Sequence, residues 1–256
     1  MYIDTHCHLT DKRYEEINLI VSEYEKYSVS SVITMGCNLI DTIDSLKLAE
    51  KYDSIYFGAG VHPTDANKLA DGDLDEIKKL ATHPKCVCIG EIGLDYYWDK
   101  SYNELQKEVL IKQLEFAKEL KLPFSFHCRE ATEDTLKLLK ENKDKIIYGG
   151  VMHCFSGSKE TAKELLKLGL KIGVGGTATF KNARNIVEVI DSLALGDLLT
   201  ETDSPYLSPE PFRGKTNTPK NIPIIVDFIA KRKNLSIEEC ANAIKQNAKE
   251  LFTKLK

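Results

Sequence analysis

Two histidines stand two residues apart near the start of the chain, at His6 and His8. The apolar residues before them predict a β-strand over 2–8, and side chains two apart on a strand project to the same side. Two imidazoles side by side at a strand end can take up one divalent metal ion. An isolated pair of this kind, however, more often marks two surface histidines. The pair therefore indicates a metal site only if the rest of the chain supplies further ligands.

Other side chains that suit a metal or an anion follow later apolar runs of the same kind. At the ends of five such runs stand His62, Glu91, Asp95, His127, Arg129, His153 and Asp203. Of the six histidines in the chain, only His83 lies away from a predicted strand end. Each residue alone is consistent with a hydrogen-bonded core position. If these residues are gathered at one edge of the sheet, burying so many polar groups costs free energy unless each has a partner. Metal ions can serve as a common partner for them.

The elements that must position these residues alternate regularly along the chain. Short apolar or β-branched runs predict strands, and Lys- and Glu-rich stretches of helical period predict helices between them. The predicted strands cover 2–8, 30–35, 55–61, 86–92, 123–127, 147–154, 170–174 and 198–202. The clearest helix is predicted over 102–121, where Leu105, Val109, Leu114, Ala117 and Leu120 form one apolar stripe. Two more helices are predicted over 221–233 and 237–254, the second beginning with a capping box of Ser236 and Glu239.

Eight strands alternating with helices in 256 residues predict an α/β fold, a (β/α)8 TIM barrel with extra C-terminal helices. We expect a single domain over 1–256, since no linker, repeat or low-complexity tract interrupts the pattern. A doubly wound open sheet is the alternative. It usually carries a glycine-rich phosphate loop after its first strand, and residues 4–8 contain no glycine. A barrel would bring the strand-end residues together at the carboxyl ends of its strands.

The composition narrows the class of protein. Hydrophobic residues make up 42% of the chain and charged residues 29%, as in soluble globular proteins. The net charge of −4 argues against a protein that coats nucleic acid by bulk attraction, but it allows an enzyme with a local basic pocket. Seven cysteines, an odd number, suggest reduced and mostly buried thiols in a cytoplasmic protein. No apolar run approaches membrane-spanning length and no signal peptide is expected, so we expect no membrane association.

Six short motifs together carry a family resemblance. They cover 4–8 (DTHCH), 60–63 (GVHP), 90–95 (GEIGLD), 127–129 (HCR), 153–157 (HCFSG) and 201–205 (ETDSP), with a further loop at 213–217 (RGKTN). This set resembles the TatD family of metal-dependent hydrolases, within the amidohydrolase-like barrel group. Many amidohydrolase relatives have a carboxylated lysine at the end of the fourth strand, where this chain has Glu91, as TatD-type proteins do.

The resemblance implies two divalent metal ions per chain. His6 and His8 would hold the first with Asp203 beside it, His127 and His153 would hold the second, and Glu91 would bridge the two. One glutamate can span ions about 3.5–4 Å apart, the spacing of two-metal hydrolases. Four imidazoles favour Zn, Mn, Fe or Co. Mg prefers oxygen ligands and would bind more weakly, so it would occupy the site only because of its abundance.

The implied activity is that of a deoxyribonuclease, which would hydrolyse phosphodiesters from 3′ to 5′ on single-stranded DNA or strand ends. A water shared by the two ions would lose a proton and attack in line. Glu91 and Asp203 would be catalytic, with Asp203 the general base or the residue that orients the water, although a purely ligating role is the alternative. An ester or amide hydrolase, or an aminoacyl-tRNA deacylase, would use the same ligands. The complete ligand set weighs against a binding or scaffold protein without catalysis.

Substrate contacts and supporting residues can also be named. Arg129 would clamp a phosphate or pair with Glu130 or Asp95, and the two roles are balanced. His62 would touch the substrate or support a ligand, and Asp95 would orient a ligating histidine. Arg213 and Lys215 would bring positive charge to the mouth, or simply belong to a solvated loop. DNA is the expected substrate, and no stable protein partner is implied.

Overall fold

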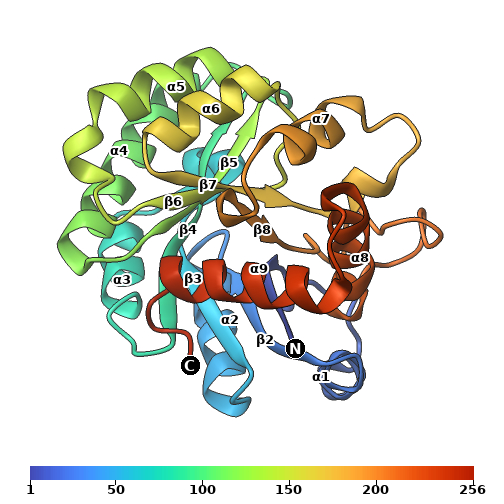
Figure 1. Cartoon of the computed structure of the whole chain (residues 1–256). Helices are drawn as coiled ribbons and strands as arrows, with labels where there is room; N and C mark the ends of the chain where they lie inside the picture. The colour runs from blue at the N-terminus through green and yellow to red at the C-terminus, as the bar shows by residue number, and fades with distance from the viewer.

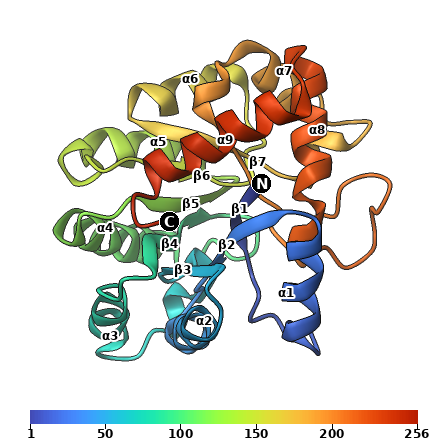
Figure 2. The same cartoon turned by 60° about the horizontal axis from the view of Figure 1, so that its bottom comes forward.

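The computed structural model describes residues 1–256 and contains one sheet of eight parallel strands, ordered β1 to β8 as in the sequence. The strands are β1 (Tyr2–Cys7), β2 (Val29–Met35), β3 (Ile55–Ala59), β4 (Cys86–Asp95), β5 (Phe124–Arg129), β6 (Gly150–Met152), β7 (Leu170–Val174) and β8 (Leu198–Thr200). A bridge between Cys7 and Ser204 joins the end of β1 to the segment after β8. The sheet therefore curls into a nearly closed barrel (Figures 1 and 2), and the predicted (β/α)8 fold is confirmed.

Helices surround this barrel on the outside (Figure 2). The α-helices are α1 (Ile17–Lys26), α2 (Leu39–Lys51), α3 (Asp73–Leu80), α4 (Asn103–Leu120), α5 (Thr132–Glu141), α6 (Lys159–Lys167), α7 (Arg184–Ser192), α8 (Ile222–Lys233) and α9 (Ile237–Leu251). Short 3₁₀ turns add η1 (Pro63–Lys68), η2 (Lys143–Lys145), η3 (Gly176–Thr179), η4 (Leu195–Asp197) and η5 (Pro219–Asn221). The predicted helices correspond to α4, α8 and α9, and the capping box of Ser236 and Glu239 is present at the start of α9. None of the helices has both the length and the apolar character needed to cross a membrane.

The sixth strand is much shorter than predicted. The prediction covered 147–154, whereas β6 contains only Gly150–Met152. Ile147 and Tyr148 are exposed, and Gly149 has a φ of 73°, a left-handed value that favours glycine and ends an extended run. On the other side Cys154 has a φ of 45°, so the chain turns directly after His153. The apolar run thus included turn residues that periodicity alone does not separate from a strand.

The interior of the barrel is closed by the C-terminal helix. Inward-facing residues of several strands, among them Ile3, Ile33 and Leu199, form a core that also contains Leu251 at the end of α9 and Phe252 directly after it. Phe252 has no exposed surface. In Figure 1 α9 crosses the barrel beside the amino-terminal ends of the strands, close to both chain termini. The site must therefore form at the opposite end, to which the carboxyl ends of the strands lead.

Removing the Phe252 side chain should test this closure. Phe252→Ala is expected to lower the free energy of unfolding by about 3–5 kcal/mol, because it leaves a cavity under the barrel floor. Urea denaturation followed by circular dichroism measures the change. Ile40→Ala on α2, where the side chain is 74% exposed, is the matched control and should change stability by less than about 0.5 kcal/mol. Equal effects of the two substitutions would show that α9 does not seal the barrel.

Candidate metal centre

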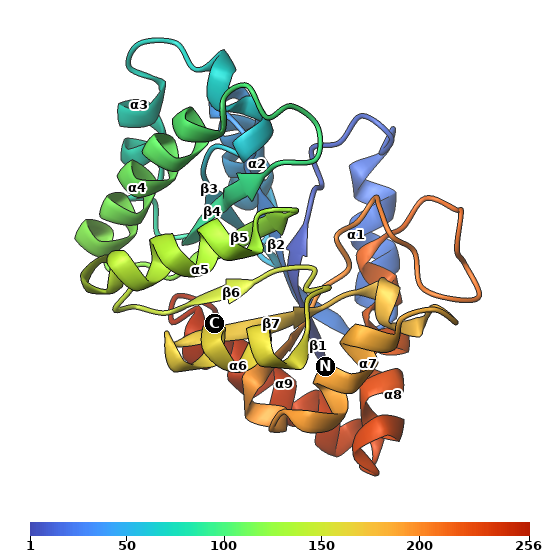
Figure 3. The same ribbon diagram turned by 90° about the horizontal axis from the view of Figure 1, so that it is seen from above.

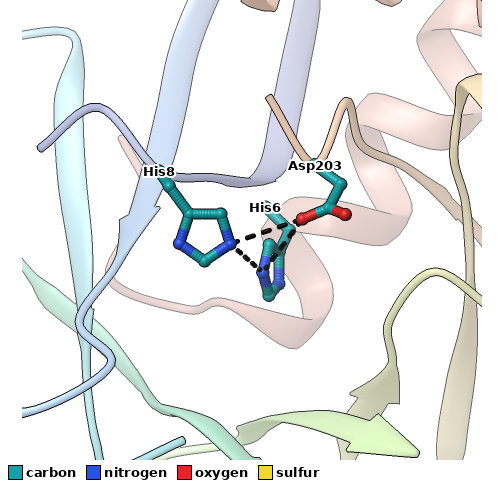
Figure 4. A group of neighbouring side chains, drawn as sticks. All are labelled: His6, His8 and Asp203. Carbon is teal, nitrogen blue, oxygen red and sulfur yellow. Dashed lines mark hydrogen bonds and ion pairs between the residues drawn. The ribbon is translucent and has the colours of Figure 1, made fainter. Parts of the chain in front are cut away.

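His6, His8 and Asp203 form a compact group where β1 ends beside the segment after β8 (Figure 4). The Nε2 atoms of the two histidines lie 3.3 Å apart. Asp203 Oδ1 lies 3.3 Å from His8 Nε2 and 4.0 Å from His6 Nε2. All three side chains turn their polar atoms toward one point, as the alternation along β1 predicted for the two histidines.

Backbone hydrogen bonds between the end of β1 and the segment after β8 hold this group in place. The Asp203 N–H donates to the His6 carbonyl at 2.9 Å, and the His8 N–H donates to the Ser204 carbonyl at 2.7 Å. Asp203 adopts a left-handed φ of 53°, which aspartate tolerates better than most residues. The Asp4 carboxylate accepts the Thr202 N–H at 2.9 Å from the buried side of β1. Asp4, which the motif contains but to which we assigned no role, therefore fastens β1 to the segment that carries Asp203.

Glu91 stands between this group and a second one. Its Oε2 lies 3.4 Å from His6 Nε2 and 3.6 Å from His8 Nε2. Its Oε1 lies 3.0 Å from His127 Nδ1 and 2.9 Å from His153 Nε2. Each oxygen of the one carboxylate thus faces a different pair of histidines, which is the arrangement that a bridging ligand requires.

His127 is fixed from behind by Asp95. The Oδ2 of Asp95 lies 2.9 Å from His127 Nε2, the ring nitrogen that faces away from Glu91. Residues Gly93 and His127 are paired across β4 and β5, and a Cβ at position 93 would overlap the His127 carbonyl oxygen. Only glycine permits this close approach, and its φ of 147° is also one that other residues avoid. The predicted orienting position of Asp95 is thus present in the structure.

Burial and neighbouring charges act on the ionisation of the cluster in different directions. Burial tends to raise the pKa of Glu91, but the histidines around it, led by His153, hold that pKa well below its ordinary value. Burial lowers the pKa of His6, so its ring stays neutral and keeps a lone pair for a ligand bond. Burial also opposes charge on His153, yet Glu91 and Glu201 raise its pKa well above the usual value. An arriving cation would take over the role of that proton.

The spacing of the donor atoms suits metal coordination. Ligands about 2.0–2.1 Å from a tetrahedral ion lie roughly 3.3 Å from one another. Four distances among His6, His8, Asp203 and Glu91, of 3.3, 3.3, 3.4 and 3.6 Å, are close to this value. The fifth, between His6 Nε2 and Asp203 Oδ1, is longer at 4.0 Å. Imidazole and carboxylate together suit Zn, Mn, Fe and Co, so the donor set fits a divalent transition metal.

Glu201 supports the second group and was missed in the sequence. It is fully buried, its Oε1 lies 3.6 Å from His153 Nδ1, and it also accepts the Cys154 N–H. Gly173 on β7 makes room for it, because a Cβ there would collide with the carboxylate. The acid stands two residues before Asp203 in the same motif, so alternation along the strand was the available signal. Ser125, whose Oγ lies 3.0 Å from His6 Nδ1, was also missed.

The expected substrate contacts lie at different distances from this cluster. His62 belongs to it, since its Nε2 lies 3.6 Å from Glu91 Oε1, and burial lowers its pKa to about 4. Arg129 forms neither of the ion pairs considered for it; its guanidinium lies over the Tyr97 ring instead. Arg213 and Lys215 lie over the rings of Phe180 and Phe212. The segment that carries them runs between β8 and α8 and lies beside the segment that follows β1 (Figure 3). The Tyr14 hydroxyl donates a 2.6 Å hydrogen bond to the Asn217 carbonyl and joins the two segments.

Asp95→Asn tests the support given to His127. We expect it to weaken binding of one metal ion by about 10- to 100-fold, because the amide orients the ring less strongly and makes it less basic. Calorimetric titration of the metal-free protein with Zn²⁺ measures this. Asp71→Asn, at an exposed position, is the control. Unchanged affinity for every ion in Asp95→Asn would remove Asp95 from the centre.

A parallel barrel with buried histidines and carboxylates at the carboxyl ends of its strands is an architecture of metal-dependent hydrolases. This chain matches the family described as "TatD related DNase" over residues 3–253 and belongs to that family. It is therefore a metal-dependent hydrolase of the TatD family, and the resemblance seen in its motifs is confirmed.

Relatives match along nearly the whole chain. The Bacillus subtilis (strain 168) protein named uncharacterized metal-dependent hydrolase YabD is 41% identical over 98% of this chain and 99% of its own length. The Escherichia coli (strain K12) relative YcfH, which carries the same description, is 34% identical over 98% and 95%. The crystal structure of the TatD homologue YjjV from Escherichia coli K12 superimposes with a TM-score of 0.92 at 32% identity, covering 98% of both chains.

Proposed function

We propose that the chain is a deoxyribonuclease that binds two divalent metal ions per subunit and hydrolyses phosphodiester bonds at the ends of single DNA strands. The family description supports a nucleic acid substrate. The observation that carries the proposal is the division of Glu91, with Oε2 directed to His6 and His8 and Oε1 to His127 and His153. A carboxylate shared in this way matches the bridge of a two-metal hydrolase.

The residues would then divide the work. His6, His8 and Asp203 would hold one ion, His127 and His153 the other, and Glu91 both. When bound, the ions would polarise the phosphoryl oxygens and lower the pKa of an attacking water. Asp203 would accept the proton of that water. It is ionised and so able to accept one, because neighbouring histidines, led by its hydrogen bond with His8, keep the pKa of this buried acid below its ordinary value despite burial. Asp95 and Glu201 would hold the rings of His127 and His153 in position.

Two histidine variants should affect different ions. His6→Ala is expected to remove the first ion, with a loss of affinity greater than the roughly 100-fold that a supporting residue causes, and to leave the second less affected. His127→Ala should do the reverse. Metal content after dialysis against graded zinc concentrations distinguishes them. His83→Ala, which changes a histidine remote from the cluster, is the control. Loss of both ions to the same extent in both variants would contradict two separable binding groups.

A substrate screen tests the proposed reaction. The Mn-loaded protein should cleave single-stranded DNA more rapidly than blunt duplex DNA, and the metal-free protein should cleave neither. The same screen contains RNA, small phosphodiesters, acyl esters and an aminoacylated tRNA. Hydrolysis of acyl esters or of aminoacyl-tRNA alone would reassign the same metal centre to ester hydrolysis or deacylation and overturn the choice of DNA.

The location and partners of the protein stay predictions. All seven cysteines are free and four of them are buried, an arrangement that suits the reduced thiols expected in the cytoplasm. DNA is the proposed partner, as substrate. The local cations on the loops, Arg129, Arg213 and Lys215, would offset the overall charge of −4 near the strand.

A further inference from the structure

Two aromatic side chains stand exposed directly after β4. Tyr97 is 47% exposed and Trp98 is 68% exposed, which makes Trp98 the most exposed aromatic residue of the chain. Their rings lie edge to face, with centroids 4.8 Å apart. Exposing two neighbouring rings of this size to water costs free energy, because burying apolar surface is favourable. Such an exposed apolar patch at the mouth of a candidate active site marks an interaction site.

A cation completes this surface. The Arg129 guanidinium lies 3.7 Å from the centroid of the Tyr97 ring and 5.4 Å from that of Trp98. Arg129 makes no ion pair and no side-chain hydrogen bond, so its donors remain free for a ligand. A planar cation beside aromatic rings is a recurring means of holding unpaired bases, since each base has a π-face and each nucleotide a phosphate.

The three residues are tied to the candidate metal centre by Asp95. Its Oδ1 accepts the Tyr97 N–H at 3.0 Å, while its Oδ2 lies 2.9 Å from His127 Nε2. The Tyr96 N–H also donates to the Arg129 carbonyl at 2.9 Å, which fastens the loop to the end of β5. Trp98 is three residues from Asp95, so the length of the chain keeps their Cα atoms within about 11 Å. A ligand at the rings therefore lies within a few nucleotides of a phosphate at the metal centre.

We propose that Tyr97, Trp98 and Arg129 form a stacking shelf for an unpaired nucleobase close to the bond that is cut. This inference rests on the proposed function, because it assumes a nucleic acid strand. The shelf selects single strands, since the faces of paired bases in a duplex are covered by their neighbours. The same pairing of arginine with an aromatic ring recurs where Arg213 lies over Phe180. Arg13 also lies over a ring, that of Tyr206, but it is already paired with Asp11. A strand that reached Arg213 would meet a further cation there.

The chain has one tryptophan, Trp98, so tryptophan fluorescence reports on the shelf directly. The zinc-loaded Asp203→Asn variant, which we expect to bind a strand without cutting it, is titrated with oligothymidylate. We expect saturable quenching of the emission by a stacked base. An abasic strand of tetrahydrofuran analogues with equal length and charge should produce little quenching, and a blunt duplex should produce little as well.

Variants separate stacking from charge. Trp98→Ala in the otherwise unchanged enzyme should raise KM for oligothymidylate by about 5- to 150-fold, the range for loss of one stacked base. The increase should be much smaller on the abasic strand, and Trp98→Phe should restore most of the loss. Tyr148→Ala is the matched control, because Tyr148 is a 38% exposed aromatic residue just before β6, at the far end of the barrel.

The outcomes distinguish this inference from the proposed function. If the wild-type enzyme cuts oligothymidylate while the strand leaves the Trp98 emission unchanged, the shelf is wrong and the nuclease proposal stands. An equal rise in KM of Trp98→Ala on normal and abasic strands would also reject stacking. If the wild-type enzyme cuts no nucleic acid and hydrolyses only acyl esters, the proposed function fails and the shelf fails with it.

Discussion

Glu91→Ala is expected to lower the rate of DNA hydrolysis by on the order of 10³-fold or more and to reduce the metal content of the protein for both ions. Loss of a single group that stabilises the charge developing in the transition state already lowers the rate by about 10²–10³-fold. Glu91 would hold both of the metal ions that provide this stabilisation. The four histidines that face its two oxygens would lose the carboxylate that lies against their ring nitrogens. Hydrolysis of single-stranded DNA and elemental analysis on the same preparation measure the two effects together.

The folding of the Glu91 variant has to be measured together with its activity, because Glu91 is buried. The far-ultraviolet circular dichroism of Glu91→Ala should stay close to that of the wild type, since the barrel core lies beneath the cluster. Glu91→Gln, which keeps the volume and removes the charge, gives a second variant if alanine disturbs the fold. Glu133→Ala, at an exposed position on α5, is the matched control. Full nuclease activity in a folded Glu91 variant would show that Glu91 is not the bridge.

Asp203→Asn should have the next largest effect. We expect kcat to fall by about 10²–10⁴-fold, the usual contribution of a general base, with a smaller change in KM. The amide keeps the size of the side chain and one ligand oxygen, so the first ion should bind more weakly but still saturate at high zinc concentration. Steady-state kinetics on single-stranded DNA at saturating metal measures the effect, and Asp71→Asn on an exposed turn is the control.

The same experiment separates two roles of Asp203. If added zinc restores kcat fully, Asp203 acts as a metal ligand alone and another group takes the proton. If kcat stays low in the fully loaded variant, Asp203 serves the reaction itself. Wild-type kcat in Asp203→Asn without any excess of metal would exclude both roles.

The sequence predicted most of the fold because the barrel repeats one simple pattern. The run at 170–174 matched β7 to the residue, and the other predicted strands except the sixth differ from the observed ones by a few residues at most. The sixth failed because Ile147 and Tyr148 are apolar yet exposed, and Gly149 turns the chain just after them. The closing role of α9 was not predicted, because it depends on contacts between Phe252 and strands far away in the sequence.

The candidate site could be anticipated to a similar degree. The strand-end positions and the family resemblance together led to His6, His8, Glu91, His127, His153 and Asp203, and the structure brings all six side chains together. Glu201 and Ser125 escaped notice, since their roles depend on which ring nitrogen of a histidine faces outward. Arg129 was predicted to meet a phosphate or a carboxylate, and its position over Tyr97 depends on a loop conformation that no periodicity describes.

Anomalous diffraction from crystals of the Mn-loaded protein is the most direct test of the binuclear centre. Two peaks per chain, about 3.5–4 Å apart, are expected. One should lie among His6, His8 and Asp203, the other beside His127 and His153, with one Glu91 oxygen facing each. A single peak at saturating manganese, or two peaks of which neither touches Glu91, would contradict the account.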